Sequence, residues 1–297
     1  MTEGTRVAPE RPELPPLREV IAAHGITARR ALGQHFLLDM NLTRRVARAA
    51  GDLRQVTVIE VGPGPGGLTR ALLLEGARRV IAIERDERCV AALQSLMRAF
   101  PGRLEIVAAD ALEVDAAALA REAQGPAKIV ANLPYNIAVP LLLRWLGDLP
   151  AFESLTLMFQ KEVAARITAV PRTKAYGRLS VMVQWLCEAR ALFDVRPSAF
   201  TPPPKVTSTV VQLIPRPRPL AEADRGALER VVAAGFGQRR KMLRTSLKSL
   251  GLDAAALIDA VGLDPTARAE ELTVQEFCAL ARALPGIARE SAGGGAG

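Results

Sequence analysis

Short runs of β-branched and other apolar residues alternate with helical segments between residues 56 and 160. Each run has the length of a buried strand and is followed by a helical pattern, for example Leu68–Glu75 or Glu87–Ala99. This alternation is typical of an α/β fold with a parallel, doubly wound sheet. The predicted strands are Val56–Val61, Val80–Glu84, Leu104–Ala108, Ile129–Ala131 and Leu155–Phe159.

Two later runs, Ala191–Val195 and Thr207–Ile214, have no helix between them, so we expect an antiparallel hairpin at one edge of the sheet. Prolines then punctuate the chain, and helical periodicity follows, interrupted by glycines. The sequence therefore predicts four parts. These are a disordered Pro- and Glu-rich segment (1–16), an α/β domain (17–216), a small all-helical domain (217–285) and a flexible Gly-rich tail (286–297).

The positive charge is concentrated in one stretch. The net charge is +8, and residues 205–250 hold most of the excess of basic over acidic residues. Within them, residues 238–248 contain no acid, and their apolar residues recur at roughly helical spacing. We predict a helix with a basic face that contacts phosphates, although a merely solvated face would look the same. The candidate contacts are Arg239, Arg240, Lys241, Arg244 and Lys248.

Other classes of protein are disfavoured. The three cysteines, Cys89, Cys187 and Cys278, have no short spacing, which argues against a disulfide framework or a zinc site. The most apolar stretch, residues 129–146, is interrupted by prolines and polar residues, so no membrane span is predicted. We also see no signal or transit peptide. We expect a cytoplasmic protein without a metal.

A glycine turn follows the first predicted strand. Gly62, Gly64 and Gly67 match G-x-G-x-x-G, and such glycines let a backbone turn sharply and approach a ligand closely. An acidic residue, Glu84, ends the second strand, where a carboxylate would bind ribose. This pattern alone fits a nicotinamide dinucleotide as well as S-adenosylmethionine.

A second carboxylate, Asp110, ends the third strand and could accept a hydrogen bond from an adenine amino group. Three consecutive strand ends thus carry glycines, an acid for ribose and an acid for adenine. Open α/β sheets bind ligands at these carboxyl ends. The arrangement resembles the class I S-adenosylmethionine-dependent methyltransferase fold more than a dehydrogenase.

The fourth strand leads into Asn132-Leu133-Pro134-Tyr135, which resembles the catalytic motif of methyltransferases that act on the adenine amine. The exocyclic nitrogen is a poor nucleophile because its lone pair is delocalised into the ring. The Asn132 side-chain oxygen and the Leu133 carbonyl can accept its two N–H groups. Pro134 fixes the turn, and Tyr135 offers a face for stacking. Such an enzyme works by positioning and needs no nucleophilic side chain.

Several segments together resemble the rRNA adenine dimethyltransferase family, over residues 17–285. These segments are Leu32–Asp39, the glycine turn, Asn132–Tyr135, Met158–Val163, Phe200–Val206 and Gly237–Leu243. The last of them favours the small-subunit branch. The resemblance implies that S-adenosylmethionine is used to dimethylate two adjacent adenosines near the 3′ end of small-subunit (16S) rRNA. It further implies a role in maturation of an immature small ribosomal subunit, and we expect a monomer.

Positions carried over from the family assign roles to single residues. The implied cofactor contacts are His35, Leu37, Gly62, Gly64, Glu84, Asp110 and Asn132. Tyr135 and Phe200 would sandwich the target adenine. Many relatives have Asn at the position of His35, where the backbone could still serve the cofactor. Residues 217–285 would bind RNA, and because an adenine in a helix is inaccessible, the base must be unstacked.

Three alternatives remain open at this point. The chain could methylate another amine or amide, such as a DNA adenine or a protein glutamine. It could be an RNA-binding assembly factor whose catalysis is incidental. It could also be an NAD-dependent oxidoreductase, but the strand ends offer no plausible hydride-site His or Lys, and the Asn132–Tyr135 motif has no role there.

Overall fold

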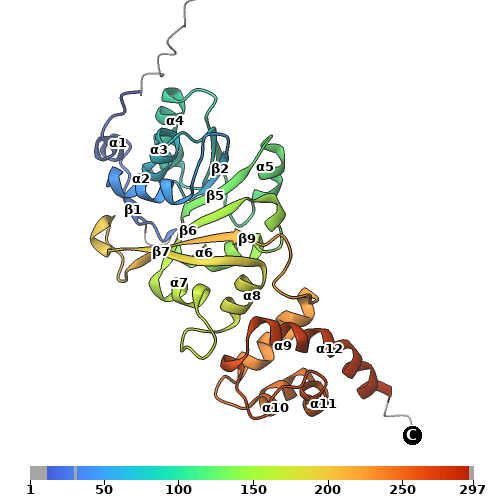
Figure 1. Cartoon of the computed structure of the whole chain (residues 1–297). Coiled ribbons are helices and arrows are strands. Elements are labelled where there is room, and N and C mark those ends of the chain that lie inside the picture. Colours follow the sequence, from blue (N-terminus) through green and yellow to red (C-terminus); the bar gives the residue numbers. More distant parts are fainter. Residues whose placement is uncertain (1–11, 30–31, 294–297) are drawn as a thin grey trace, which may run out of the picture. The chain divides into compact units, whose positions relative to one another are not determined.

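The computed structural model describes residues 12–29 and 32–293 (Figure 1). The chain forms two compact units. The first contains the residues up to Phe159 together with Leu192–Val210. The second contains Gln160–Ala191 together with the residues from Val211 onward.

A seven-stranded sheet has the strand order β4-β3-β2-β5-β6-β9-β7. The pairs β2–β3, β3–β4, β2–β5 and β5–β6 are parallel, which confirms the five strands predicted from the alternation. The chain runs outward from β2 through β3 to β4 and then returns to β5 on the other side of β2. The direction in which successive strands are added to the sheet therefore reverses between β2 and β5. Ligands bind at such switch points in open α/β sheets. The strands are β2 (Thr57–Val61), β3 (Arg79–Glu84), β4 (Leu104–Ala108), β5 (Ala127–Asn132), β6 (Ser154–Gln160), β7 (Cys187–Val195) and β9 (Ser208–Pro215).

Aspartates cap several helices of the first unit. Asp39, Asp86 and Asp115 each precede a helix and accept a hydrogen bond from a backbone N–H of its first turn, which satisfies a donor that has no partner within the helix. The helices are α1 (Leu17–Ala23), α2 (Met40–Ala49), α3 (Gly67–Leu74), α4 (Glu87–Ala99), α5 (Ala116–Glu122) and α6 (Tyr135–Trp145), with short 3₁₀ turns η2 (Leu149–Ala151) and η3 (Pro197–Ala199).

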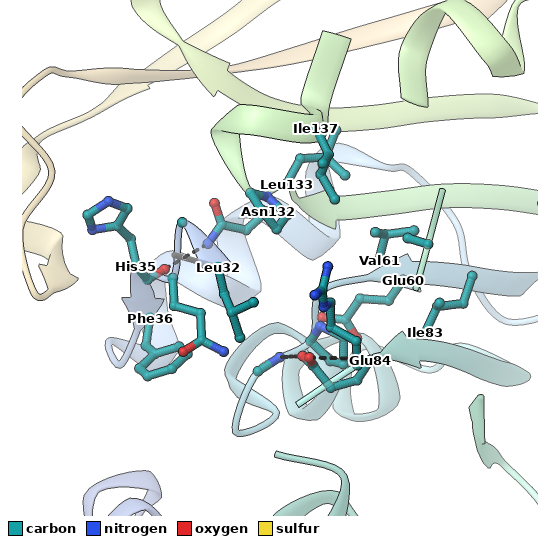
Figure 2. Close-up of a pocket in the computed structure, with 18 of the residues that line it drawn as sticks. Leu32, His35, Phe36, Glu60, Val61, Ile83, Glu84, Asn132, Leu133 and Ile137 are labelled. Atoms are coloured by element: carbon teal, nitrogen blue, oxygen red, sulfur yellow. Dashed lines mark hydrogen bonds between the residues drawn. The ribbon is translucent and has the colours of Figure 1, made fainter. Parts of the chain in front are cut away.

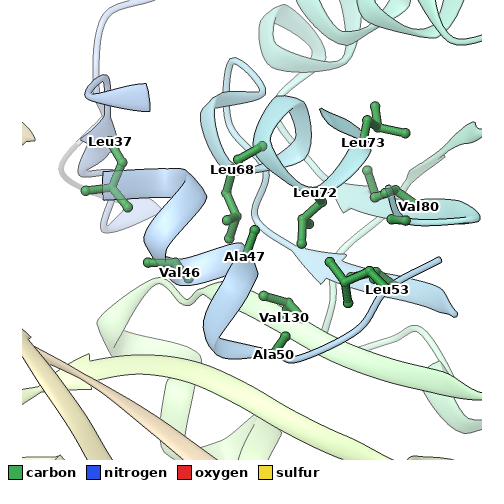
Figure 3. Packing of buried hydrophobic residues seen from close by; sticks show 14 of the residues in the cluster. Leu37, Val46, Ala47, Ala50, Leu53, Leu68, Leu72, Leu73, Val80 and Val130 are labelled. Carbon is green, nitrogen blue, oxygen red and sulfur yellow. The ribbon is translucent and has the colours of Figure 1, made fainter. Parts of the chain in front are cut away.

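One large hydrophobic cluster lies between the sheet and helices α2, α3 and α4 (Figure 3). Alternate strand residues such as Val58, Val80 and Val130 point into it and are completely buried. The residues between them, such as Ile59 and Ile129, are equally buried. Burial of both faces explains why these strands are continuously apolar.

A second, two-stranded sheet joins β1 (Phe36–Leu37) to β8 (Phe200–Thr201) in antiparallel fashion. Phe36 pairs with Thr201 and Leu37 with Phe200. The N-terminal segment is thereby held to a loop more than 160 positions away in the sequence. β9 and β7 are neighbours at one edge of the seven-stranded sheet, as expected for two runs without an intervening helix.

The helices of the second unit come from two parts of the sequence. Helices α7 and α8 precede β7, and the remaining helices follow β9. Its aromatic centre stacks Phe236 on Phe277 and places Tyr176 edge-on to Phe236. No helix in the described part of the chain is long and apolar enough to cross a membrane. The elements are α7 (Lys161–Thr168), α8 (Arg178–Leu186), α9 (Arg225–Gly237), α10 (Leu243–Ser246), η4 (Leu247–Leu250), α11 (Ala254–Asp259), η5 (Ala269–Glu271) and α12 (Val274–Gly293).

The observed parts differ from the predicted ones in three places. Residues 12–16 of the predicted disordered segment are placed, because Arg70 donates to the Pro15 carbonyl and Leu14 packs on the core; residues 1–11 lie outside the described part. Helix α12 continues to Gly293, so most of the predicted tail is helical, and residues 294–297 are not described. Helices α7 and α8 belong with the C-terminal helices, since Arg178 donates to the Ala233 carbonyl.

Candidate active site

A pocket opens at the carboxyl ends of β2, β3, β4 and β5, where the order of the strands reverses (Figure 2). The segment Leu32–Leu37 forms its remaining wall. Every cofactor residue predicted from the sequence lines this pocket, as do the four residues of the Asn132–Tyr135 motif. Four strand ends and one distant segment therefore converge on one cavity in the first unit.

The glycine turn after β2 is shaped by backbone conformation and by crowding. Gly62, Gly64 and Gly66 all have positive φ, which side chains with a Cβ rarely adopt. A Cβ on Gly62 would lie 3.2 Å from Pro134 Cδ, and one on Gly64 would lie 3.0 Å from the Phe36 ring. The turn consequently leaves open a space that any larger residue would begin to fill.

Glu84 holds the glycine turn to the end of β3. Its Oε2 accepts the Gly64 N–H at 3.0 Å, and its Oε1 accepts the N–H groups of Arg85 and Asp86 at 2.9 and 2.8 Å. Burial raises the pKa of Glu84, although these bonds favour the charged form. The predicted ribose-binding carboxylate is thus already oriented by three backbone donors.

Asp110 lines the pocket, as predicted, and it has a partner that was not expected from the sequence. Its Oδ2 accepts from Arg85 Nη1 at 2.7 Å, and its Oδ1 accepts the Leu112 N–H at 3.0 Å. Arg85 also lines the pocket and directly follows Glu84, so its position at a strand end was the signal that could have revealed it.

Glu60 is a second pocket residue to which the sequence analysis gave no role. It is almost fully buried, and its Oε2 has no hydrogen-bond partner among the described residues. Burial raises the pKa of this carboxyl to about 8. The neighbouring Thr69 hydroxyl interacts with this carboxyl and opposes the rise in its pKa, so Glu60 is a buried carboxyl in the pocket wall with Thr69 beside it.

Asn132 is the last residue of β5, and its side chain is oriented by the N-terminal segment. Its Nδ2 donates to the His35 carbonyl at 3.1 Å. A carbonyl can only accept, so this contact assigns the nitrogen to that side. Figure 2 shows the Asn132 oxygen pointing away from the bond. The pocket therefore presents an acceptor from Asn132, just before Pro134 begins the turn into α6.

The two residues predicted to stack on the base, Tyr135 and Phe200, differ in exposure. Tyr135 is partly buried at the pocket, and its hydroxyl lies 2.6 Å from Ser208 Oγ; burial raises its pKa. The His35 ring lies 5.6 Å from Tyr135 and 6.4 Å from Phe200, centroid to centroid. Phe200 is only 3% exposed and belongs to the hydrophobic cluster of the sheet. Stacking of a base on Phe200 therefore stays a prediction.

The basic segment is not the continuous helix that we predicted. Residues 238–242 form a turn, and only afterwards does the short helix α10 begin. The reason is tertiary: Arg239 pairs with Glu270 at 2.6 Å and donates to the Thr173 carbonyl, while Met242 bridges to Arg268. Of the predicted phosphate contacts, Arg239 is thus partly engaged within the protein. The exposed ones are Arg240, Lys241, Arg244 and Lys248.

Three further basic residues adjoin this turn within the second unit. Arg172, Lys174 and Arg178 are exposed. The backbone N–H of Arg172 donates to the backbone carbonyl of Glu270 at 2.7 Å. The carboxylate of the same Glu270 pairs with Arg239. They are not apparent from the sequence, because they lie about 65 positions before the basic segment and form no charge run.

Comparison with known proteins agrees with the geometry. Residues 25–285 match the family model described as "Ribosomal RNA adenine dimethylase". The chain is 63% identical over 286 residues to "Ribosomal RNA small subunit methyltransferase A" of Rhodospirillum rubrum, which covers 96% of this chain and 98% of the relative. It is 65% identical over 272 residues to the protein of that name from Paramagnetospirillum magneticum, covering 92% and 95%.

Solved structures share the fold. A dimethyladenosine transferase from Plasmodium falciparum has a TM-score of 0.73 at 24% identity, covering 86% of this chain and 98% of that one. The 23S rRNA methyltransferase ErmE has a TM-score of 0.63 at 29% identity, covering 84% and 99%. The fold is that of a class I S-adenosylmethionine-dependent methyltransferase. Within that class, the chain belongs to the ribosomal RNA adenine dimethylase family.

Gly67 offers a test of how the pocket is assembled. A Cβ at this position would collide with the Leu37 carbonyl oxygen, which belongs to β1. We expect Gly67→Ala to destabilise the protein by about 1–3 kcal/mol, the usual cost of overpacking, and to weaken ligand binding in the pocket. Chemical denaturation measures the first effect and calorimetry the second.

Gly286→Ala is the matched control, because Gly286 lies within α12 and a Cβ there meets nothing within 4 Å. That change should stabilise the helix slightly. Equal stability of Gly67→Ala and wild type would show that β1 does not pack against the glycine turn as described.

Proposed function

We propose that this protein binds S-adenosylmethionine in the pocket and transfers methyl groups to the exocyclic amines of two adjacent adenosines near the 3′ end of small-subunit (16S) rRNA. Membership of the family supports the class of reaction, and the names of the most similar relatives support the small subunit as substrate. The observation that carries the proposal is the oriented Asn132 amide beside the glycine turn.

The pocket fits the cofactor by shape and by donor set. The glycine turn forms a cradle that a Cβ would begin to fill, and the buried Glu60 carboxyl lines the same pocket. We assign Gly62, Gly64 and the backbone of His35 and Leu37 to the cradle. Glu84 would hold the ribose hydroxyls and Asp110 the adenine amine. When bound, the cofactor supplies an electrophilic methyl group.

The chain's contribution to the reaction is positioning. The Asn132 oxygen and the Leu133 carbonyl would accept the two N–H groups of the target amine, which favours a pyramidal nitrogen with its lone pair available. The acceptors are preorganised, since the His35 carbonyl fixes the amide of Asn132 and Pro134 fixes the turn. Tyr135 would stack on the base, and Phe200 would close over its other face.

We assign recognition of RNA to the C-terminal helices, residues 217–285, through exposed Arg240, Lys241, Arg244 and Lys248. Arg239 would act mainly by shaping the turn that presents them. The substrate we propose is an immature small ribosomal subunit in the cytoplasm, in which the target adenosines are unstacked, and the enzyme would act as a monomer.

The proposal is tested by incubating the protein with undermethylated small ribosomal subunits and labelled S-adenosylmethionine, followed by nucleoside mass spectrometry. We expect label in dimethyladenosine from small-subunit rRNA. Label in another nucleoside, or in protein, would point to a different amine or amide substrate. Tight subunit binding without any label would favour an assembly factor.

Asn132→Ala should reduce turnover far more than cofactor affinity. Losing one preorganised acceptor can cost roughly 10²-fold or more in rate, because it acts mainly in the transition state. Single-turnover methylation and calorimetry with S-adenosylhomocysteine separate the two effects. Asn41→Ala, at an exposed position of α2, is the control and should behave like wild type. Wild-type turnover of Asn132→Ala would remove Asn132 from the reaction.

Charge reversal at Arg240 and Lys241 should weaken RNA binding and flatten its dependence on salt, since each lost phosphate contact lowers the slope by about 0.7–0.9. Stability should stay near wild type because both side chains are exposed. Arg239→Ala should instead lower the melting temperature, because Glu270 loses its partner. Charge reversal at Arg98, an exposed residue of α4, is the control for the variant at Arg240 and Lys241. An unchanged salt slope in the double variant would make these residues a solvated surface.

A further inference from the structure

His35 connects three parts of the active site. Its backbone carbonyl accepts from Asn132, its ring lies beside Tyr135 and Phe200, and its Nδ1 is 2.8 Å from the Pro202 carbonyl oxygen. The next two residues, Phe36 and Leu37, form β1 and pair with β8. The side-chain contact thus extends a backbone pairing of only two residues.

The protonation of the contacting nitrogen follows from its partner. A carbonyl oxygen only accepts, so His35 Nδ1 carries the hydrogen. Both the neutral Nδ1–H tautomer and the imidazolium provide it. Position 35 therefore requires a donor attached to Cγ. Asparagine places its Nδ2 at the same number of bonds from the backbone, glutamine places it one carbon further, and leucine has a similar branched shape without a donor.

The loop of residues 200–206, which accepts this hydrogen bond, has few backbone donors of its own. Residues 202–204 are prolines and have no backbone N–H, so they cannot donate to a neighbouring strand. They can only accept through their carbonyls. His35 supplies a donor to the first of them, at the point where the pairing between β1 and β8 ends.

We propose that His35 is a positioning residue: its side chain holds the loop of residues 200–206 while its backbone carbonyl holds Asn132, so that Phe200 and Tyr135 keep the spacing required by the target base. This role is separate from the cofactor contact that we assign to the His35 backbone. The proposal rests on the proposed function for its catalytic consequence, but the structural contact can be tested without any activity.

The test compares His35→Asn, which keeps the donor, with His35→Leu and His35→Gln, which remove or displace it. We expect His35→Asn to retain wild-type kcat/KM within about twofold. The other two should lose roughly 3- to 10-fold, the factor that one neutral hydrogen bond contributes. Calorimetry with S-adenosylhomocysteine should give a similar Kd for all. His24→Leu, at the chain's other histidine, controls for loss of an imidazole.

Hydrogen exchange in the free proteins is the second readout. The amides of the paired strands β1 and β8 should exchange faster in His35→Leu than in wild type, and His35→Asn should restore their protection. Unchanged exchange in His35→Leu would overturn the proposal even if methylation fell. A proportional loss of cofactor affinity would show that the side chain is a cofactor contact instead. If wild type fails to methylate the subunit, the proposed function fails while the exchange result still decides the role of His35.

Discussion

The active site depends on the close approach of the β1 backbone to the start of α3. Gly67 leaves room for the Leu37 carbonyl oxygen, which a single methyl group would displace. Because β1 can lie there, His35 reaches both Asn132 and the Pro202 loop, and the segment Leu32–Leu37 becomes a wall of the pocket. One missing side chain thus allows the N-terminal segment to organise the catalytic turn.

Two buried carboxyl groups of the pocket, Glu84 and Glu60, have different surroundings. Glu84 is satisfied by three backbone N–H groups and ties β3 to the glycine turn, so it contributes to the scaffold before any ligand binds. Glu60 lies in the same pocket with an oxygen that has no partner among the described residues. Glu84 therefore shapes the cavity, while Glu60 adds a second buried carboxyl to the pocket wall.

The second unit uses ion pairing to present charge. Glu270 holds Arg239 through its carboxylate and Arg172 through its backbone, so two basic segments distant in the sequence are joined at one acid. The cations that remain exposed lie on a turn and two short helices instead of one long helix.

The sequence by itself determined the sheet, its parallel strands and the residues at their carboxyl ends. Apolar runs of strand length alternate with helices, and the glycines, Glu84, Asp110 and Asn132 stand at the ends of those runs, so their convergence follows from the parallel topology. Periodicity and local motifs carry this information because the apolar pattern typical of a buried strand is a property of a short segment.

Only the tertiary structure decided the contacts between distant segments. Three features depend on elements that are far apart in the sequence and therefore give no periodic signal. They are the pairing of Arg85 with Asp110, the burial of Phe200 and the contact of His35 with Pro202. The same reason explains the wrong helix at residues 238–242. There the local pattern favoured a helix, but the ion pair of Arg239 with Glu270 and the bridge of Met242 to Arg268 hold the chain in a turn.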